Sequence, residues 1–168
     1  MVIVQIIGGL GNQMFQYAAG QALAKRLGTN LVLDISAFEN YTLHQGFELN
    51  RVFAMIPAIA TRQHLRRVLG WQHTPMVRSL LSRRSFAALR SPHFVFEPHF
   101  HHWNSFDQLG NDIYLVGYWQ SEKYFKPVIA QTREDFKYRL PLEGLNTELA
   151  ARISQTHAVS LHVRRGDY

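Results

Sequence analysis

Residues 2–13 read VIVQIIGGLGNQ and predict the beginning of an α/β fold. The run Val2–Ile7 is short, apolar and β-branched, which is typical of a buried strand. Residues 13–27 follow with many helix-forming side chains and stop at Gly28, which suits a helix C-cap. Residues 31–34 read LVLD and predict a second strand. A strand, a glycine turn, a helix and a strand make a βαβ unit, so we expect a parallel sheet.

The glycine turn between the strand and the helix, residues 8–13, has the properties of an anion-binding site. Glycine tolerates positive φ and lets a ligand approach the backbone closely, while the helix N-terminus offers unpaired N–H groups and a favourable dipole. We therefore expect Gly9, Gly11 and Asn12 to bind a diphosphate or sugar hydroxyls. Gln13 would add a second neutral donor at the same place. The pattern is neither a dinucleotide fingerprint nor a P-loop, and a tight turn with an ordinary cap is the alternative interpretation.

Short elements fill the rest of the chain. Residues 35–50 predict a long loop, and the arginine-rich residues 62–90 predict short basic helices. We interpret those arginines as a solvated helix face; nucleic-acid binding and attraction to an anionic membrane surface are the alternatives. Further strands are predicted at 93–96, 113–119 and 158–163, and further helices at 121–138, interrupted near Pro127, and at 145–154.

The composition is that of a soluble globular chain. Of its 168 residues, 46% are hydrophobic and 18% are charged. No apolar run approaches the roughly 18 residues of a membrane-spanning helix, and the apolar start is interpreted as the first strand, not as a signal peptide. The absence of cysteine excludes disulfides and thiolate metal sites and fits a reducing, cytoplasmic location. The net charge of +6 suits nucleic acid, anionic lipid or phosphorylated ligands alike.

The last residues, 158–168, read AVSLHVRRGDY and predict a strand that leads into a phosphate-binding loop. His162 and Arg164 would share one face of that strand, and Arg165 would lie at the turn that follows. Arginine suits phosphate because its planar guanidinium donates paired, charge-assisted hydrogen bonds, and Asp167 would fix one guanidinium group. A solvated basic turn with a local Arg–Asp pair is the alternative. Because a helix normally follows such a loop, this strand looks like the opening of a second βα unit.

Two further side chains are candidates at the end of the strand predicted at 113–119. Trp119 would stack on a sugar ring, and Gln120 would bond sugar hydroxyls. A core aromatic at a strand end is the alternative for Trp119. A nearby cluster of metal-ligand types lacks a separated further ligand, so we interpret it as a surface loop and not as a metal site. It comprises Glu97, His99, His101 and His102.

Three motifs occur along the chain: GGLGNQMFQYA at residues 8–18, GYWQSEKYF at 117–125 and HVRRGDY at 162–168. In this order and separation they resemble the bacterial α-1,2-fucosyltransferases of glycosyltransferase family 11, and the resemblance spans the whole chain. It implies a GT-B-like fold, in which two Rossmann-like lobes bind the donor between them. Residues 1–157 would form the N-terminal α/β lobe on the acceptor side, with a parallel sheet and helical insertions. Residues 158–168 would be the opening strand and loop of the lobe that binds GDP-fucose, and family members continue well past this point.

The resemblance also implies an activity. It is the inverting transfer of fucose from GDP-fucose to a galactoside hydroxyl, in α-1,2 linkage and in surface glycan synthesis, without a metal or other cofactor. Arg165 would contact the β-phosphate as the catalytic residue, because an arginine prearranged in a dry cleft stabilises a leaving group without a metal. The donor-binding residues that the resemblance implies are Gly9, Gly11, Asn12, His162, Arg164, Arg165 and Asp167.

The implied partners are GDP-fucose and a galactose-terminated glycan, with no nucleic acid. Peripheral association with the inner membrane face is a further expectation, which rests on the basic helices. The general base stays unassigned, since His162 and Asp167 lie near the right place but also suit orienting roles. The alternatives are a non-catalytic truncated fragment or sugar-binding remnant, and a GDP-fucose transferase of α-1,6 or protein O-linked specificity.

Overall fold

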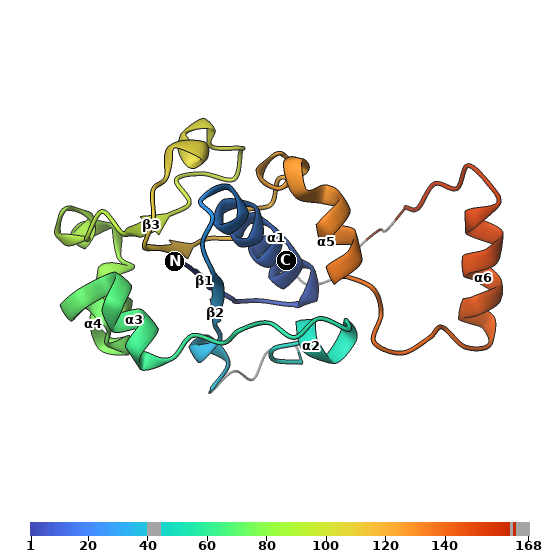
Figure 1. Ribbon diagram of the computed structural model, residues 1–168, viewed down its shortest axis with the longest axis horizontal. Coiled ribbons are helices and arrows are strands. Elements are labelled where there is room, and N and C mark those ends of the chain that lie inside the picture. The colour runs from blue at the N-terminus through green and yellow to red at the C-terminus, as the bar shows by residue number, and fades with distance from the viewer. Residues whose placement is uncertain (40–44, 162, 164–168) are drawn as a thin grey trace.

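A four-stranded parallel sheet forms the centre of the chain (Figure 1). The computed structural model describes residues 1–39, 45–161 and 163. The strands lie in the order β2-β1-β4-β3, and every pairing between them is parallel. The structure thereby confirms the predicted α/β class with a parallel sheet, the arrangement of a Rossmann-like lobe. The strand bounds are Val2–Gln5 for β1, Leu31–Asp34 for β2, Phe94–Phe96 for β3 and Ile113–Val116 for β4.

Helix α1 (Leu10–Arg26) connects β1 to β2 and completes the predicted βαβ unit. It begins earlier than predicted, because Gly9 is its N-cap. Its end confirms the prediction: Gly28 has a φ of +60°, and the N–H of Thr29 bonds back to the Ala24 carbonyl at 3.0 Å. This is the Schellman arrangement, which glycine favours because it requires a left-handed residue at the helix C-terminus.

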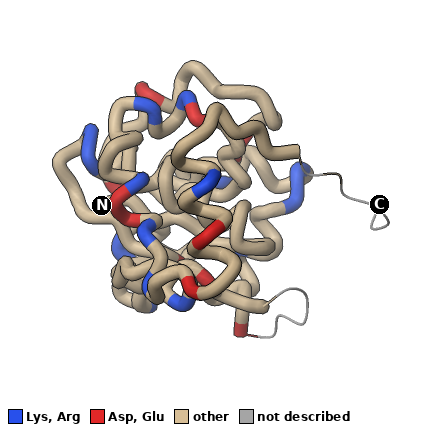
Figure 2. The backbone as a smooth tube through the Cα atoms, turned by 90° about the vertical axis from the view of Figure 1, so that its right-hand side faces the viewer, with Lys and Arg blue, Asp and Glu red and all other residues tan. Residues whose placement is uncertain are grey.

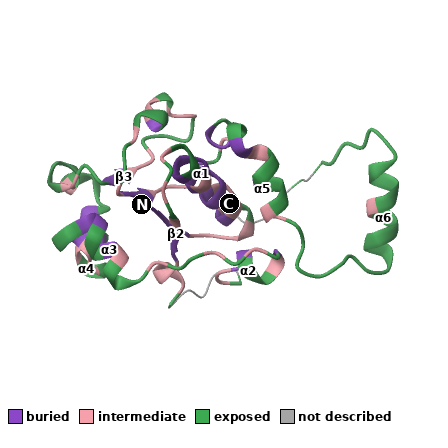
Figure 3. Cartoon of the chain, in the orientation of Figure 1, coloured by how far each residue is buried: buried purple, intermediate pink, exposed green. Residues whose placement is uncertain are grey.

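The two faces of the sheet are covered by different helices. Helix α1 packs on one face, and α3 (Arg62–Leu69) and α4 (Pro75–Leu81) pack on the other. Because side chains alternate along a strand, Val2 and Val4 lie in the core cluster beneath α1, whereas Ile3 lies in the cluster beneath α3 and α4. Figure 3 shows the resulting buried centre, with α1 and the strands in purple.

The remaining elements of the first 140 residues are short, and they confirm that residues 62–90 form short basic helices. Most arginines of that region are exposed, as interpreted, and Figure 2 shows Lys and Arg spread among Asp and Glu. Arg90 is half-buried, and Arg78 is buried, with only 7% of its surface exposed. The solvated-face interpretation is wrong for Arg78, because α4 directs this side chain onto the sheet. The other short helices are η1 (Ser36–Phe38), α2 (Leu49–Val52), η2 (Gly70–His73), η3 (Arg84–Leu89), η4 (Asn104–Gln108), η5 (Glu122–Tyr124), η6 (Lys126–Val128) and α5 (Ile129–Asp135).

Helix α6 (Leu145–Ser154) matches its prediction and stands apart from the body of the molecule (Figure 1). It buries none of its residues. The strand predicted at 158–163 is wrong for the residues that the structure describes, since 158–161 and 163 are exposed and form no strand. A strand is stabilised by its ladder, and no described strand lies beside this segment. Within the described ranges, no helix is both long and apolar enough to cross a membrane.

The close approach of α1 to the sheet depends on Gly20. A Cβ atom at this position would lie 2.3 Å from Cγ2 of Val4 and 2.9 Å from Cδ1 of Leu31. By contrast, a Cβ atom at Gly11 in the same helix would meet nothing within 4 Å. The two glycines therefore separate the packing role of a helical glycine from its effect on the backbone.

We expect Gly20→Ala to lower the free energy of unfolding by about 1–3 kcal/mol, the usual cost of overpacking a core, reduced by the helix propensity that alanine adds. Gly11→Ala is the matched control and should leave stability unchanged or raise it by up to about 1 kcal/mol. Urea denaturation followed by circular dichroism measures both values. Equal effects of the two substitutions would contradict the packing role of Gly20.

Candidate functional site

The loops that leave the four strands meet at one edge of the sheet. Because all strands are parallel, their carboxyl ends lie together, and this is the edge where open α/β sheets bind ligands. The glycine turn follows β1, residues 35–39 follow β2, and residues 117–121 follow β4. The structure therefore brings the first two motifs of the sequence to the same place.

The glycine turn has the geometry of an anion site. Gly8 is left-handed with a φ of +77°, and a Cβ atom there would lie 2.6 Å from Nδ2 of Asn12. No side chain caps α1 at Gly9. The first N–H that bonds back to the helix start is that of Gln13, which reaches the Gly9 carbonyl at 3.2 Å. The N–H groups before it, including that of Gly11, can therefore donate to a ligand.

Asn12 and Gln120 form an exposed amide pair beside this turn. Nε2 of Gln120 donates to Oδ1 of Asn12 at 2.6 Å, although the residues are 108 positions apart. The sequence predicted that Asn12 binds the donor and that Gln120 binds the acceptor. The structure places the two side chains in direct contact. The remaining amide atoms, a nitrogen on Asn12 and an oxygen on Gln120, have no hydrogen-bond partner among the described residues. The pair thus offers one donor and one acceptor to a ligand.

Gln13 does not join them, which corrects the expectation that it donates to a ligand. The residue is fully buried. Its Nε2 donates to the carbonyls of Gly8 at 2.9 Å and Gly46 at 2.8 Å. Its Oε1 accepts the N–H of Glu48 at 2.9 Å. All of these bonds hold the glycine turn against the segment that precedes α2.

Gln16 plays the same part almost one turn further along the same face of α1, and sequence reasoning missed it. It is also fully buried. Its Oε1 accepts the N–H of Ile7 at 3.0 Å, and its Nε2 donates to the carbonyl of Gly117 at 3.0 Å. The side chain thereby ties the ends of β1 and β4 together. Its buried role could have been inferred from the sequence, because an amide on the apolar face of a predicted helix needs hydrogen-bond partners in the core.

Glu97 shapes the loop that carries Gln120. Its Oε2 accepts the N–H groups of Tyr118 at 2.7 Å and Trp119 at 3.0 Å. A Cβ atom on Gly117 would lie 2.4 Å from Cβ of Glu97, so only glycine fits there. The second carboxylate oxygen, Oε1, is buried and has no hydrogen-bond partner among the described residues. Glu97 is therefore a loop-positioning group, which the sequence did not identify.

Trp119 is a core residue, which corrects the prediction that it stacks on a sugar. It is fully buried, with its ring 5.2 Å from that of Phe106 and 5.5 Å from that of Tyr124 between centroids. No face of the indole is open to a ligand. Its φ of +54° is left-handed, a conformation that costs a non-glycine residue about 1–3 kcal/mol. This turn directs Trp119 inward and Gln120 outward.

The histidines after β3 make local contacts. Nδ1 of His99 lies 2.9 Å from the His101 carbonyl, and Nδ1 of His102 lies 3.1 Å from Oδ1 of Asn104. Glu97, which the sequence grouped with them, faces the backbone of residues 118 and 119 instead. In the part of the chain that the structure describes, no group of three or more His, Cys, Asp or Glu side chains is placed to hold a metal ion.

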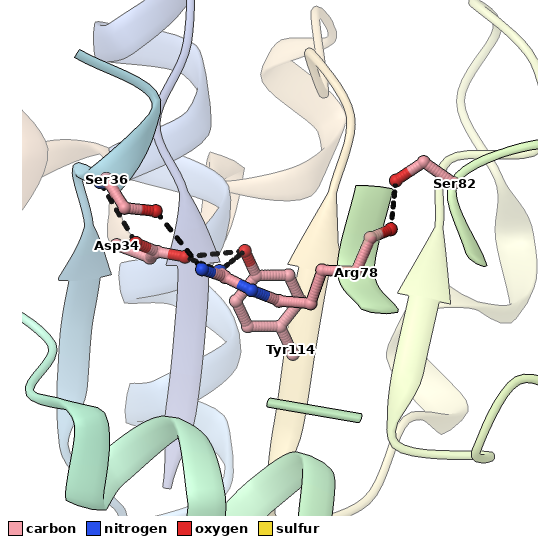
Figure 4. Close-up of polar contacts among 5 residues, drawn as sticks. All are labelled: Asp34, Ser36, Arg78, Ser82 and Tyr114. Atoms are coloured by element: carbon pink, nitrogen blue, oxygen red, sulfur yellow. Dashed lines mark hydrogen bonds and ion pairs between the residues drawn. The ribbon is translucent and has the colours of Figure 1, made fainter. Parts of the chain in front are cut away.

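A buried polar network lies on the opposite face of the sheet (Figure 4). Arg78 extends from α4 across the strands and forms an ion pair with Oδ2 of Asp34, at the carboxyl end of β2. Tyr114 of β4 donates to the same oxygen at 2.6 Å and accepts from Arg78 Nη1 at 2.7 Å. Ser36 donates its N–H to Asp34 Oδ1 at 3.0 Å and accepts from Arg78 Nη2 at 3.3 Å. The network fixes the loop after β2.

The charges of this network stabilise one another. Burial alone would raise the pKa of Asp34, but the hydrogen bond from Tyr114 and the charge of Arg78 outweigh it and hold this pKa below its ordinary value of 3.8. Burial, followed by the charge of Asp34, raises the pKa of Tyr114 well above 10.0. The tyrosine therefore stays protonated and the ion pair stays charged near neutral pH.

The arginine motif lies outside the described residues. His162, Arg164, Arg165 and Asp167 belong to the segments without a described placement. Their predicted roles at the donor therefore stay predictions.

Comparison with known proteins identifies relatives over the whole chain. The model of the family described as Glycosyl transferase family 11 matches residues 1–168. The alpha-1,2-colitosyltransferase of Escherichia coli is 32% identical over 169 residues, which are 100% of this chain and 55% of that protein. The O-antigen biosynthesis glycosyltransferase WbnK of Escherichia coli is 30% identical over 180 residues, which are 96% of this chain and 57% of that protein. The chain thus spans about half the length of these relatives. No solved structure matches it significantly.

We expect Asp34→Asn to lower the free energy of unfolding by about 3–5 kcal/mol, because it leaves the buried guanidinium of Arg78 without a counter-charge. Asp112→Asn is the matched control: its carboxylate pairs with the N-terminal amine at 2.8 Å but is 37% exposed. Exposed pairs contribute less than about 1 kcal/mol. Urea denaturation at neutral pH compares the variants, and similar small losses for both would contradict the buried role of Asp34.

The effect of Asp34→Asn on the free energy of unfolding should also depend on pH. A carboxyl group whose pKa is lowered by folding stabilises the protein above its ordinary pKa and ceases to do so as the pH falls through the lowered value. The stability difference between the wild type and Asp34→Asn should therefore be constant from about pH 7 to pH 5 and shrink below about pH 4. A difference that grows in acid would show that the pKa is raised.

We expect Glu97→Ala to destabilise the protein by about 1–3 kcal/mol, since it leaves the N–H groups of Tyr118 and Trp119 without their acceptor. Glu97→Gln retains one acceptor oxygen and should recover most of that loss. Glu122→Ala, at an exposed position of η5, serves as the control and should stay within about 0.5 kcal/mol of the wild type. Thermal unfolding measures all three. Equal stability of the Ala and Gln variants would exclude a role for the acceptor oxygen.

Proposed function

Because this chain belongs to glycosyltransferase family 11, we propose that it carries the acceptor-side lobe of an inverting fucosyltransferase. The donor is GDP-fucose, the acceptor is a galactose-terminated surface glycan, and the new linkage is α-1,2. The observation that carries this proposal is the meeting of the free N–H groups at the start of α1 with the amides of Asn12 and Gln120 at the carboxyl edge of the sheet. Such an edge suits a sugar diphosphate, which has both anionic oxygens and hydroxyls.

The chemistry follows from the donor. The acceptor hydroxyl attacks C1 of fucose, the bond between C1 and the β-phosphate oxygen breaks, and GDP leaves from the opposite face with the bonding electrons. The hydroxyl proton passes to a base that we leave unassigned. Negative charge grows on the β-phosphate oxygen, and Arg165 neutralises it in the proposed enzyme. A guanidinium prearranged in this way supplies the stabilisation that a metal ion would otherwise provide, so the reaction is proposed to be metal-independent.

The proposed donor contacts fall into two groups. Gly9, Gly11 and Asn12 act through backbone N–H groups and a side-chain amide at the start of α1. The second group is the arginine motif, in which Arg164 and Arg165 face the diphosphate. Gln120 is proposed to bind the acceptor, where its free amide oxygen accepts a hydrogen bond from a sugar hydroxyl. His162 and Asp167 complete the motif as orienting residues.

A second donor sugar is favoured by one relative. The name of the Escherichia coli alpha-1,2-colitosyltransferase gives colitose as the sugar that it transfers, and colitose is fucose without the hydroxyl at C3. A site that does not read this hydroxyl accepts both sugars, whereas a site that hydrogen-bonds it rejects colitose. Assaying both GDP-sugars, with EDTA present, against a β-galactoside and detecting the product by mass spectrometry decides between them. Absence of transfer from either donor by the folded full-length protein would refute the proposed function.

We expect Arg165→Ala to lower kcat about a hundred- to thousandfold in the full-length protein, equivalent to about 3–4 kcal/mol of transition-state stabilisation. Arg66→Ala is the matched control, because Arg66 is exposed on α3 and distant in sequence from every proposed contact. Initial rates of fucose transfer at saturating substrates provide the measurement. If Arg165→Ala retained more than about a tenth of the wild-type rate, its catalytic role would be wrong.

A further inference from the structure

A groove lies at the carboxyl edge of the sheet, on the face that α3 and α4 cover. It consists of two hollows of about 840 and 410 Å³ that share Ser36, Pro75 and Arg78 in their walls. Both volumes fall within the roughly 300–1,000 Å³ of typical small-molecule sites. None of the residues of the glycine turn lines either hollow, so the groove is a separate feature of the edge.

We propose that this groove binds the acceptor glycan as a neutral sugar chain, an inference that rests on the proposed function. The position supports it, because the groove opens at the same edge of the sheet as the donor contacts. A chain seated there can direct its terminal hydroxyl over the edge towards the glycine turn. In this proposal the acceptor therefore lies on the face of the sheet opposite α1.

The balance of charge favours a neutral ligand. The larger hollow is lined by the carboxylates of Asp34 and Glu39 and by the guanidinium groups of Arg62 and Arg78. Two negative and two positive groups cancel, and the ion pair between Asp34 and Arg78 is already closed. A phosphate would find no excess positive charge in this hollow. Sugar hydroxyls, which both donate and accept, match such a mixed lining.

The larger hollow also suits the shape of a sugar ring. Its wall combines apolar side chains, including Ile59 and Leu65, with polar ones, including His73 and Thr74. A pyranose has an apolar face of C–H groups and a rim of hydroxyls, so both kinds of surface find a counterpart. Ligand sites commonly pair an apolar lining with a few polar groups that fix orientation.

The smaller hollow connects the groove to the donor side. It is lined by Gln5, Ser79 and Ser82 together with Tyr114. Gln5 is the last residue of β1 and directly precedes the segment that enters the glycine turn. No hydrogen bond of its side-chain amide is found within the described residues, which leaves that amide free for a ligand hydroxyl. The terminal sugar of the acceptor therefore fits this hollow.

Arg78 is the fixed wall between the two hollows. Asp34, Tyr114 and Ser36 hold its guanidinium, so the groove keeps its shape without a ligand. Its Nε is buried and has no partner among the described residues. Preorganised walls of this kind reduce the entropy lost on binding.

Ser79→Trp tests the groove, because an indole at this exposed position of α4 fills the smaller hollow without disturbing the core. Ser85→Trp, at an exposed position of η3 outside both hollows, is the control. In the full-length protein, with GDP-fucose as donor and lactose as acceptor, we expect Ser79→Trp to raise the KM for lactose about tenfold or more while the KM for GDP-fucose stays constant. An unchanged KM for lactose, or a rise confined to GDP-fucose, overturns the proposal.

A binding measurement separates this proposal from the proposed function. Lactose is titrated into the ¹⁵N-labelled protein while the Nε–H signal of Arg78 is followed by nuclear magnetic resonance. A saturable shift in the wild type and in Ser85→Trp, absent in Ser79→Trp, supports the groove even if no fucose is transferred. A wild-type signal that lactose does not move overturns the groove even if transfer occurs.

Discussion

The two buried amides of α1 hold the candidate site together. Gln13 and Gln16 are fully buried, and a buried amide is tolerated only when its donors and acceptors find partners. Those partners are backbone groups of the loops at the carboxyl edge, including Ile7 and Gly117. The requirement to satisfy two side chains in the core therefore fixes the loops that form the candidate site. In this way, the position of the glycine turn relative to the end of β4 is set from inside the molecule.

On the opposite face of the sheet, buried charged groups also require partners and thereby fix the elements that carry them. Asp34 and Arg78 are both buried, and neither is tolerated there without the other. Since Arg78 comes from α4 and Asp34 from the end of β2, their pairing positions a helix against a loop. The hydroxyl of Tyr114 and the hydroxyl of Ser36 complete the set. The polar groups that stabilise the core beneath α3 and α4 thus also form the rigid wall of the groove on the same face of the sheet.

The sequence predicted the fold better than the site. Local patterns indicated the four strands of the sheet, the Gly28 cap and α6, because each depends on residues close together in the chain. The pairing of Arg78 with Asp34 spans 44 positions, and a single sequence carries no signal for it. The burial of Arg78, as distinct from its partner, could have been inferred from the apolar Leu81 one helical turn later, because this spacing places both side chains on the inner face of α4. Trp119 was assigned to the site because it ends the predicted strand, although alternation from Ile113 and Leu115 already places it in their core cluster beneath α1, where the structure has it.

The chemistry of the glycine turn explains why the proposed reaction needs a second motif. The side chains that the structure places at the turn, Asn12 and Gln120, are neutral amides. In the proposed enzyme, these amides, the backbone N–H groups and the helix dipole orient a diphosphate and favour its charge by a modest amount, about 0.3–1 kcal/mol for a dipole at an exposed helix end. A leaving GDP gains charge in the transition state, and a neutral amide responds to that gain far less than a guanidinium does. In the proposed enzyme, the turn therefore holds the donor, and the arginine motif, which includes Arg164, Arg165 and Asp167, stabilises the charge that develops when the donor reacts.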